Sequence, residues 1–175
     1  FSKKIEENAR KLKSLLSKGG IDILGITKVM LGNPKYASIL IKSGITSLGD
    51  SRIQDIIKMR KSGIDAKIFQ IRAPQISEAK YTVKYADGAF VTEIETLKAL
   101  SYYAKKYNKI FSYIVMVEMG DLREGVMPEN LFSFVKKSLD FGMEFLGIGT
   151  NLGCYGGVIP TREKIEELVS LKDIL

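Results

Sequence analysis

The sequence predicts an α/β fold built on a parallel sheet whose two faces are both covered by helices. Short runs rich in Ile, Val and Phe alternate with longer amphipathic stretches along all 175 residues. The short runs begin roughly 20 to 30 residues apart, which is the length of one strand-plus-helix unit. They are almost continuously apolar, as strands buried on both faces are.

Six segments are predicted to form the strands of this sheet: Ile21–Thr27, Ile45–Gly49, Ala66–Ile71, Gly88–Val91, Ile110–Glu118 and Met143–Gly149. Between them, amphipathic periodicity predicts helices over Pro34–Ser43, Ile53–Ser62, Ile76–Tyr85, Glu93–Tyr107 and Pro128–Phe141. Two more helices are predicted before the first strand and after the last, over Lys3–Lys18 and Arg162–Leu171.

Helix-end signals support these bounds. Ser77 and Thr161 are expected to cap helices with their side-chain oxygens. Prolines in first turns and glycines beyond last turns mark other ends, at Pro34, Pro128, Gly63 and Gly142. No linker or low-complexity segment divides residues 1–175, so we expect them to belong to one domain.

Two architectures fit this pattern, an open doubly wound sheet and a (β/α)8 TIM barrel. Six βα units fall short of eight, and a whole barrel needs about 250 residues. If the fold is a barrel, the chain supplies about six of its eight units. Further strands would then have to cover the two sheet edges.

The composition excludes several kinds of active site. The chain contains no histidine, which rules out Ser-His-Asp and Cys-His catalysis and histidine-based zinc sites. We therefore expect no metal centre, and the chemistry must rest on Lys, Arg, Asp, Glu, Tyr or a cofactor. The single cysteine, Cys154, has no histidine to activate it and is expected to be a loop residue.

The net charge of +7 raises the question of nucleic-acid binding. The basic residues are spread over predicted helices that also carry acidic ones, so we expect solvated helix faces and no nucleic-acid partner. No apolar run approaches the roughly 20 residues needed to span a membrane. A chain with one cysteine and no predicted membrane span fits a reducing cytoplasm.

Polar and charged residues follow the predicted strands at their carboxyl ends, where parallel α/β folds place their sites. They are Lys28, Asp50, Ser51, Arg52, Arg72, Thr92, Glu93, Glu118, Arg123, Thr150 and Asn151. Ser51 and Thr92 are equally well explained as helix caps. Lys28, Arg72 and Arg123 have no capping oxygen, and a lysine facing arginines suits an anionic ligand.

Lys28 is the main candidate for chemistry, although a lysine at a strand end also commonly bends out to solvent. Nearby positive charge would favour its neutral amine, which is a nucleophile towards carbonyl carbon and forms Schiff bases. The glycine-rich segment Gly147–Gly153 lacks the spacing of a dinucleotide fingerprint. We interpret it as a strand end that a ligand can approach closely, followed by a loop over the rim at Gly153–Gly157.

Four separated motifs resemble the alanine racemase N-terminal-domain superfamily of fold type III enzymes, in its ornithine racemase-like branch. They are Leu24–Val29, Asp50–Arg52, Glu118–Gly125, and Gly147–Leu152 followed by Gly156–Gly157. The resemblance covers essentially the whole chain. It implies a pyridoxal 5′-phosphate (PLP)-binding (β/α)8 barrel, completed by further βα units and a C-terminal β domain outside this chain.

The resemblance also implies roles for single residues. Lys28 matches the PLP-linked lysine, and Arg123 matches an arginine beside the cofactor's phenolic oxygen. Met116 stands where many alanine racemases have a carbamylated lysine that supports this arginine. Asn151 stands where they have a histidine packed against the pyridine ring. Asp50, Arg52 and Arg72 are interpreted as rim residues that contact cofactor or substrate.

The function implied is racemisation of an amino acid of the ornithine or alanine type, by α-proton abstraction from its external aldimine with PLP. Lys28 would be one of two bases, and the second, a tyrosine, would come from a partner subunit, so a homodimer is expected. The alternatives are a non-catalytic PLP-binding homeostasis or carrier protein and a lysine-dependent aldolase without PLP.

Overall fold

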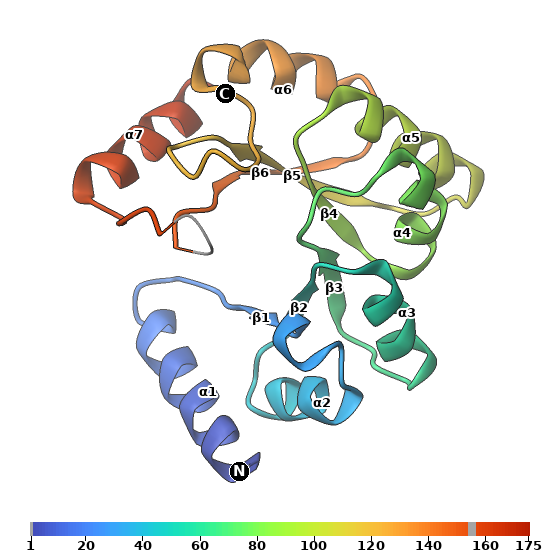
Figure 1. The fold of residues 1–175 in the computed structure, drawn as a ribbon, viewed down its shortest axis with the longest axis vertical. Coiled ribbons are helices and arrows are strands. Elements are labelled where there is room, and N and C mark those ends of the chain that lie inside the picture. The colour runs from blue at the N-terminus through green and yellow to red at the C-terminus, as the bar shows by residue number, and fades with distance from the viewer. Residues whose placement is uncertain (1, 154–156) are drawn as a thin grey trace. The chain divides into compact units, whose positions relative to one another are not determined.

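A computed structural model describes residues 2–153 and 157–175 as strands alternating with helices (Figure 1). Cys154 and its two following neighbours, which belong to the predicted rim loop, lie outside the described residues. The chain divides into two compact units, which are described separately. The first comprises Phe1–Arg72 and Lys84–Asp87, and the second comprises Ala73–Val83 and Gly88–Leu175.

The first unit contains three parallel strands in chain order. They are β1 (Leu24–Ile26), β2 (Ser47–Asp50) and β3 (Lys67–Gln70). Its helices are α1 (Ser2–Ser17), the 3₁₀ turn η1 (Lys28–Met30), α2 (Pro34–Lys42) and α3 (Ile53–Lys61). The fully buried side chains of Leu48, Ile56 and Ile68 show that its core lies between the strands and α3.

The second unit also contains three parallel strands in chain order. They are β4 (Gly88–Val91), β5 (Ser112–Val117) and β6 (Glu144–Thr150). Its helical elements are η2 (Ile76–Glu78), α4 (Ala79–Tyr85, whose last residues belong to the first unit), α5 (Ile94–Lys106), η3 (Pro128–Asn130), α6 (Leu131–Leu139) and α7 (Arg162–Asp173). Leu97, Leu100 and Val115 are fully buried in its core.

The alternation of strands and helices is therefore confirmed, with differences at the element ends. The first strand begins at Leu24, where its pairing with β2 starts, and Ile21 and Asp22 before it are exposed to solvent. Thr161 caps α7 as predicted, since its side chain accepts a hydrogen bond from Lys164 N–H. The prediction that Ser77 caps a helix was wrong, because Ser77 lies within η2, whose N-cap position is Gln75.

The interpretation of Ser51 and Thr92 as helix caps is also wrong. The N-cap positions of α3 and α5 are Arg52 and Glu93, and neither forms a capping side-chain hydrogen bond. Strand burial follows the prediction for β2 and β3, which are buried after their first residue. Strand β6 is less covered, and Leu146 is 49% exposed.

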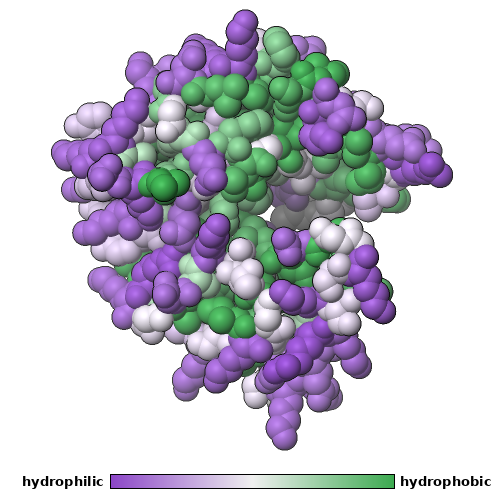
Figure 2. Space-filling view, turned by 180° about the vertical axis from the view of Figure 1, so that it is seen from behind, coloured by the Kyte–Doolittle hydropathy of each residue, from purple (hydrophilic) through white to green (hydrophobic). Residues whose placement is uncertain are grey.

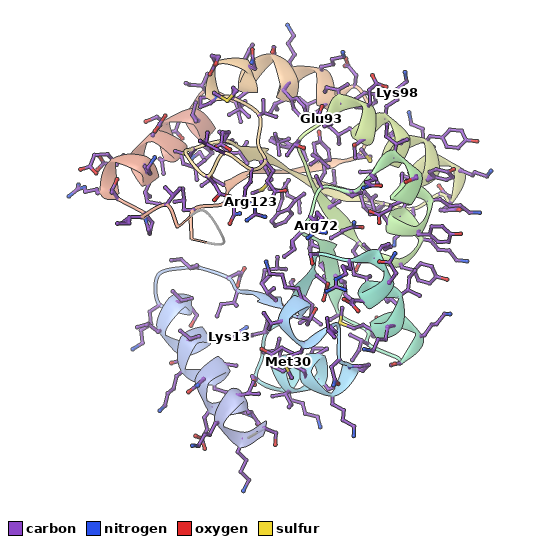
Figure 3. The ribbon with its side chains drawn as sticks, in the orientation of Figure 1. Lys13, Met30, Arg72, Glu93, Lys98 and Arg123 are labelled. Carbon is purple, nitrogen blue, oxygen red and sulfur yellow. The ribbon has the colours of Figure 1, made fainter. Side chains whose placement is uncertain are left out.

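The helices present charged faces to solvent, as their amphipathic patterns predict. Hydrophilic side chains cover much of the face seen in Figure 2, with smaller hydrophobic areas between them. On α1, the lysine labelled in Figure 3, Lys13, donates a hydrogen bond to the carbonyl of Gly44 and so holds α1 against the end of α2. No helix in the described part of the chain is long and apolar enough to cross a membrane.

Candidate functional site

Lys28 lies where β1 ends, as the sequence predicts. Its neighbour Thr27 still follows the sheet, because the Thr27 N–H donates to the Gly49 carbonyl at 2.9 Å. The chain then turns into η1, of which Lys28 is the first residue. Lys28 is half-buried, whereas Val29 and Met30 are exposed. The lysine is thus positioned by the last backbone contact between β1 and β2.

The C-terminal end of this turn, at Leu31 and Gly32, contacts α3. The Leu31 carbonyl accepts a 2.9 Å hydrogen bond from Lys58 Nζ. Gly32 has a φ of +60°, and a Cβ added there would lie 2.8 Å from the carbonyl oxygen of Asp55. Only glycine accommodates both the left-handed backbone and this close approach. The turn that carries Lys28 is therefore fixed at both of its ends.

Asp50 lies at the end of β2 and is fully buried. Its Oδ2 accepts a 2.6 Å hydrogen bond from the Thr27 hydroxyl, and its Oδ1 accepts one of 3.1 Å from Arg52 N–H. The Arg52 side chain is 56% exposed, with Nε 3.9 Å from Asp55 Oδ2. Of Asp50 and Arg52, both interpreted as rim contacts, only the arginine presents its side chain to solvent.

Arg72 follows β3 and is exposed (Figure 3). The preceding residue, Ile71, donates its N–H to the Asp50 carbonyl at 2.9 Å, so the ends of β2 and β3 are in register. In the first unit, Lys28, Asp50, Arg52 and Arg72 therefore all follow the carboxyl ends of neighbouring strands, as predicted.

In the second unit, the segment Glu118–Gly125 forms a loop after β5 that we call the Arg123 loop. Its two ends meet, because Glu118 N–H donates to the Val126 carbonyl at 3.0 Å and Val126 N–H donates to the Met116 carbonyl at 2.7 Å. Gly125 has a φ of +147°, and a Cβ there would lie 2.2 Å from the Glu118 nitrogen. The loop can close only because this position is glycine.

The Glu118 carboxylate organises the backbone of the Arg123 loop. Its Oε1 accepts hydrogen bonds from the N–H groups of Gly120 at 2.6 Å and Leu122 at 3.0 Å. Burial would raise the pKa of Glu118, but the N–H groups of Leu122, Gly120, Arg123 and Asp121 outweigh it and hold that pKa below its ordinary value. From α7, Lys164 Nζ also donates to the Met119 carbonyl at 2.8 Å.

Asp121 connects the two second-unit residues that the sequence singled out as cofactor contacts. Its Oδ2 accepts a 3.0 Å hydrogen bond from Asn151 Nδ2 and lies 3.7 Å from Arg123 Nη1. The Asp121 side chain is only 2% exposed, while that of Arg123 is 36% exposed. Glu124 Oε1 lies 3.9 Å from Arg123 Nη2. Two carboxylates therefore provide the negative charge beside Arg123.

The sequence reasoning missed Asp121. The sequence did carry a signal for it, because this carboxylate lies two residues before Arg123 within the motif Glu118–Gly125. Met116, which stands where the resemblance places a carbamylated lysine, is buried at the end of β5 and supplies no charge. The side-chain support for Arg123 comes instead from its own loop.

A separate open cavity of about 460 Å³ lies at the amino ends of β5 and β6. Its lining includes Lys105, Lys109, Phe111 and Met143. Because ligands of parallel α/β folds bind at the carboxyl ends of strands, this cavity is not the candidate site. Within residues 2–153 and 157–175, no group of three or more His, Cys, Asp or Glu could hold a metal ion.

Comparison with known proteins decides the family. A family model described as "Alanine racemase, N-terminal domain" matches residues 2–175. The chain belongs to the alanine racemase N-terminal domain family.

Within this family, the chain is 42% identical over 173 residues to a lysine racemase of Thermotoga maritima, covering 99% of this chain and 48% of that protein. It is 37% identical over 177 residues to an ornithine racemase of Acetoanaerobium sticklandii, covering 98% of this chain and 49% of that protein. The chain thus spans about half the length of the curated relatives it matches.

Solved structures of the family confirm the fold. The crystal structure of alanine racemase from E. faecalis superposes with a TM-score of 0.80 at 17% identity, over 97% of this chain and 48% of that chain. The prediction of a parallel α/β fold that provides six βα units of a TIM barrel is therefore correct. The alternative of a doubly wound sheet is excluded.

Proposed function

We propose that the intact protein is a PLP-dependent amino-acid racemase in which Lys28 holds the cofactor. One observation carries the proposal: a half-buried lysine follows β1 in a chain that is 42% and 37% identical to curated lysine and ornithine racemases. The carrier and aldolase alternatives have no comparable support.

The donor set of this chain fits PLP. A primary amine at the end of a core strand suits the aldehyde carbon, with which it condenses with loss of water. The partly exposed guanidinium of Arg123 suits an anionic oxygen, and Asp121 and Glu124 keep that guanidinium oriented. We propose that Lys28 and Arg123 hold the cofactor and that Asn151, bonded to Asp121, contributes to the same site.

When bound, PLP would supply an electron sink that acidifies the substrate's α-proton. Lys28 Nζ, once displaced by the substrate amine, would take that proton on one face of the α-carbon and return it on the same face in the reverse direction. A second base has to act on the opposite face. We propose that it is a tyrosine of a partner subunit in a homodimer, within a C-terminal β domain that accompanies the barrel.

We propose a basic amino acid as substrate, with ornithine and lysine as the leading candidates, because the two relatives of highest identity reported above carry those names. The exposed Arg52 and Arg72 remain proposed rim contacts for the substrate or cofactor. Alanine is the substrate to compare with them.

The proposal is tested by incubating the intact protein and PLP with L-ornithine, L-lysine and L-alanine and separating the enantiomers by chiral chromatography. We expect the D-enantiomer of at least one basic amino acid. Borohydride reduction before proteolysis should leave the cofactor on the peptide that contains Lys28, and Lys28→Ala should lose it. The matched control, Lys98→Ala on α5, should label like the wild type. Undiminished labelling of Lys28→Ala would refute the assignment.

A further inference from the structure

Thr27 and Asp50 join the carboxyl ends of β1 and β2 directly beside Lys28. Both residues are fully buried, and the Thr27 hydroxyl oxygen lies 2.6 Å from Asp50 Oδ2. We infer that Asp50 is a positioning residue that acts on Lys28 through Thr27, and not a residue that contacts cofactor or substrate. The consequence for Lys28 chemistry rests on the proposed function.

The hydrogen bonds of Asp50 support this role, because both of its carboxylate oxygens are used inside the protein. Oδ2 receives the Thr27 hydroxyl, and Oδ1 receives the Arg52 N–H at 3.1 Å. A buried carboxylate requires such donors, because an oxygen left without a partner has lost its hydrogen bonds to water and gained none in exchange. The bonds hold Asp50 at the strand ends and keep it from facing a ligand.

Thr27 transmits this restraint because it is the last residue before the chain turns. Its N–H is bonded to the Gly49 carbonyl at 2.9 Å, and its hydroxyl can donate to Asp50 Oδ2 at 2.6 Å or to the Gly49 carbonyl at 3.2 Å. The shorter bond to a charged acceptor is the stronger one. Thr27 is thus fixed through both its backbone and its side chain, which defines where the Lys28 side chain starts.

The other end of the turn is restrained independently by Lys58 on the Leu31 carbonyl and by the close approach of Gly32 to Asp55. Losing the Thr27 hydroxyl would therefore leave the turn attached through its backbone hydrogen bonds but less tightly restrained at the end that carries Lys28. Reactivity of a positioned group falls steeply when it moves by about 1 Å. The expected effect of losing the Thr27 hydroxyl is slower covalent capture of PLP by a folded protein.

The test uses the intact protein without cofactor and follows the visible absorbance of the lysine-linked cofactor after PLP is added. We expect Thr27→Ser, which keeps the hydroxyl, to react at close to the wild-type rate. Thr27→Val should slow the reaction at least tenfold. Thr82→Val is the matched control, because Thr82 is also fully buried and its hydroxyl donates to the carbonyl of Glu78 in η2, four residues earlier in the chain. This control should react like the wild type.

Asp50 variants separate positioning from direct contact. In Asp50→Asn, the new amide can donate to Thr27 Oγ1 while its oxygen accepts from Arg52 N–H, and the Thr27 hydroxyl then donates to Gly49. The hydrogen-bonded pair survives without the carboxylate charge, so the rate of PLP capture should fall less in Asp50→Asn than in Asp50→Ala. The rate of Asp50→Ala should match that of Thr27→Val. If the carboxylate instead contacted the cofactor or substrate, the rate of PLP capture would fall as much in Asp50→Asn as in Asp50→Ala. Thr27→Val would then react at the wild-type rate.

Two results overturn the inference. One is a wild-type rate of PLP capture in folded Thr27→Val. The other is an equal fall of this rate in Asp50→Asn and Asp50→Ala while Thr27→Val reacts at the wild-type rate. If Thr27→Val does not fold, the comparison of Asp50→Asn with Asp50→Ala decides the question. A wild-type protein that forms no borohydride-fixed adduct at Lys28 refutes the proposed function instead, so the two failures are distinguishable.

Discussion

Asp121 Oδ2 lies 3.0 Å from the amide nitrogen of Asn151 and 3.7 Å from Nη1 of Arg123. One buried carboxylate oxygen therefore orients two side chains that come from different strand ends, those of β5 and β6. The other oxygen, Oδ1, has no hydrogen-bond partner among the described residues. The buried carboxylate of Asp121 is therefore stabilised by the two side chains that it orients, those of Asn151 and Arg123.

Removing the Asp121 carboxylate is expected to destabilise the second unit. Asp121→Ala leaves the Asn151 amide and the Arg123 guanidinium without their shared acceptor, so the free energy of unfolding should fall by about 1–3 kcal/mol. Urea unfolding measures the change. The exposed Asp140 provides the control, and Asp140→Ala should stay within about 0.5 kcal/mol of the wild type. Equal effects of the two substitutions would contradict this role of Asp121.

Gly125 should tolerate no side chain. Gly125→Ala places a Cβ 2.2 Å from the Glu118 nitrogen at a φ of +147°, so the Arg123 loop must open, at a cost of about 3 kcal/mol or more. Gly147→Ala is the matched control, because its φ of +136° is similar but nothing lies within 4 Å of its Cβ. This control should lose only the backbone strain, about 1–2 kcal/mol. Thermal and urea unfolding of both variants provide the comparison, and similar losses would show that steric contact is unimportant.

Glu118 should make the Arg123 loop sensitive to acid. Its pKa is lower in the folded chain than in the unfolded chain, so the carboxylate stabilises the loop fully at every pH above the pKa that Glu118 has in the unfolded chain. That contribution disappears as the pH falls through the folded pKa. An NMR titration of the Gly120 and Leu122 amide signals should therefore show an acid transition with its midpoint below the ordinary pKa of a glutamate.

The neutral variant Glu118→Gln provides the comparison for this titration. It keeps an acceptor oxygen but cannot ionise, so the acid transition of the Gly120 and Leu122 signals should be absent. Glu129→Gln, at an exposed position, should titrate like the wild type. Persistence of the transition in Glu118→Gln would assign it to another group.

The order of strands and helices was predictable because it depends on local patterns of apolar residues. Pro34 and Thr161 began helices where the sequence indicated, and Lys28 lay at a strand end. The start of the first strand was not predictable in the same way. Ile21 is apolar but 55% exposed, because β2 pairs with β1 only from Leu24 onwards.

The roles of individual carboxylates could not be predicted, because their partners are distant in the sequence. Asp50 pairs with Thr27, 23 residues away, and Asp121 pairs with Asn151, 30 residues away. The sequence placed Asp50 correctly at a strand end but could not say that both of its oxygens are bound inside the protein. Such pairings follow from strand register, which the apolar pattern does not specify.

Arg60 offers a test of how the first unit is held together away from Lys28. Its side chain is 20% exposed and forms an ion pair with Asp87. Its guanidinium also donates to three backbone carbonyls, those of Tyr85 at 2.9 Å, Ile64 at 2.9 Å and Ala66 at 2.8 Å. This single residue therefore joins α3 to the segment before β3 and to the end of α4.

Lysine cannot replace this arginine, because its single ammonium cannot reach acceptors that surround a planar fork. Arg60→Lys should lower the free energy of unfolding by about 2–3 kcal/mol, since at least two of these bonds are lost. Arg10→Lys is the control, because Arg10 forms an exposed i,i+4 pair with Glu6 and should change stability by less than about 0.5 kcal/mol. Urea unfolding of the two variants in parallel measures both values. Equal stability of Arg60→Lys and Arg10→Lys would mean that the Arg60 bonds contribute no more than a surface pair.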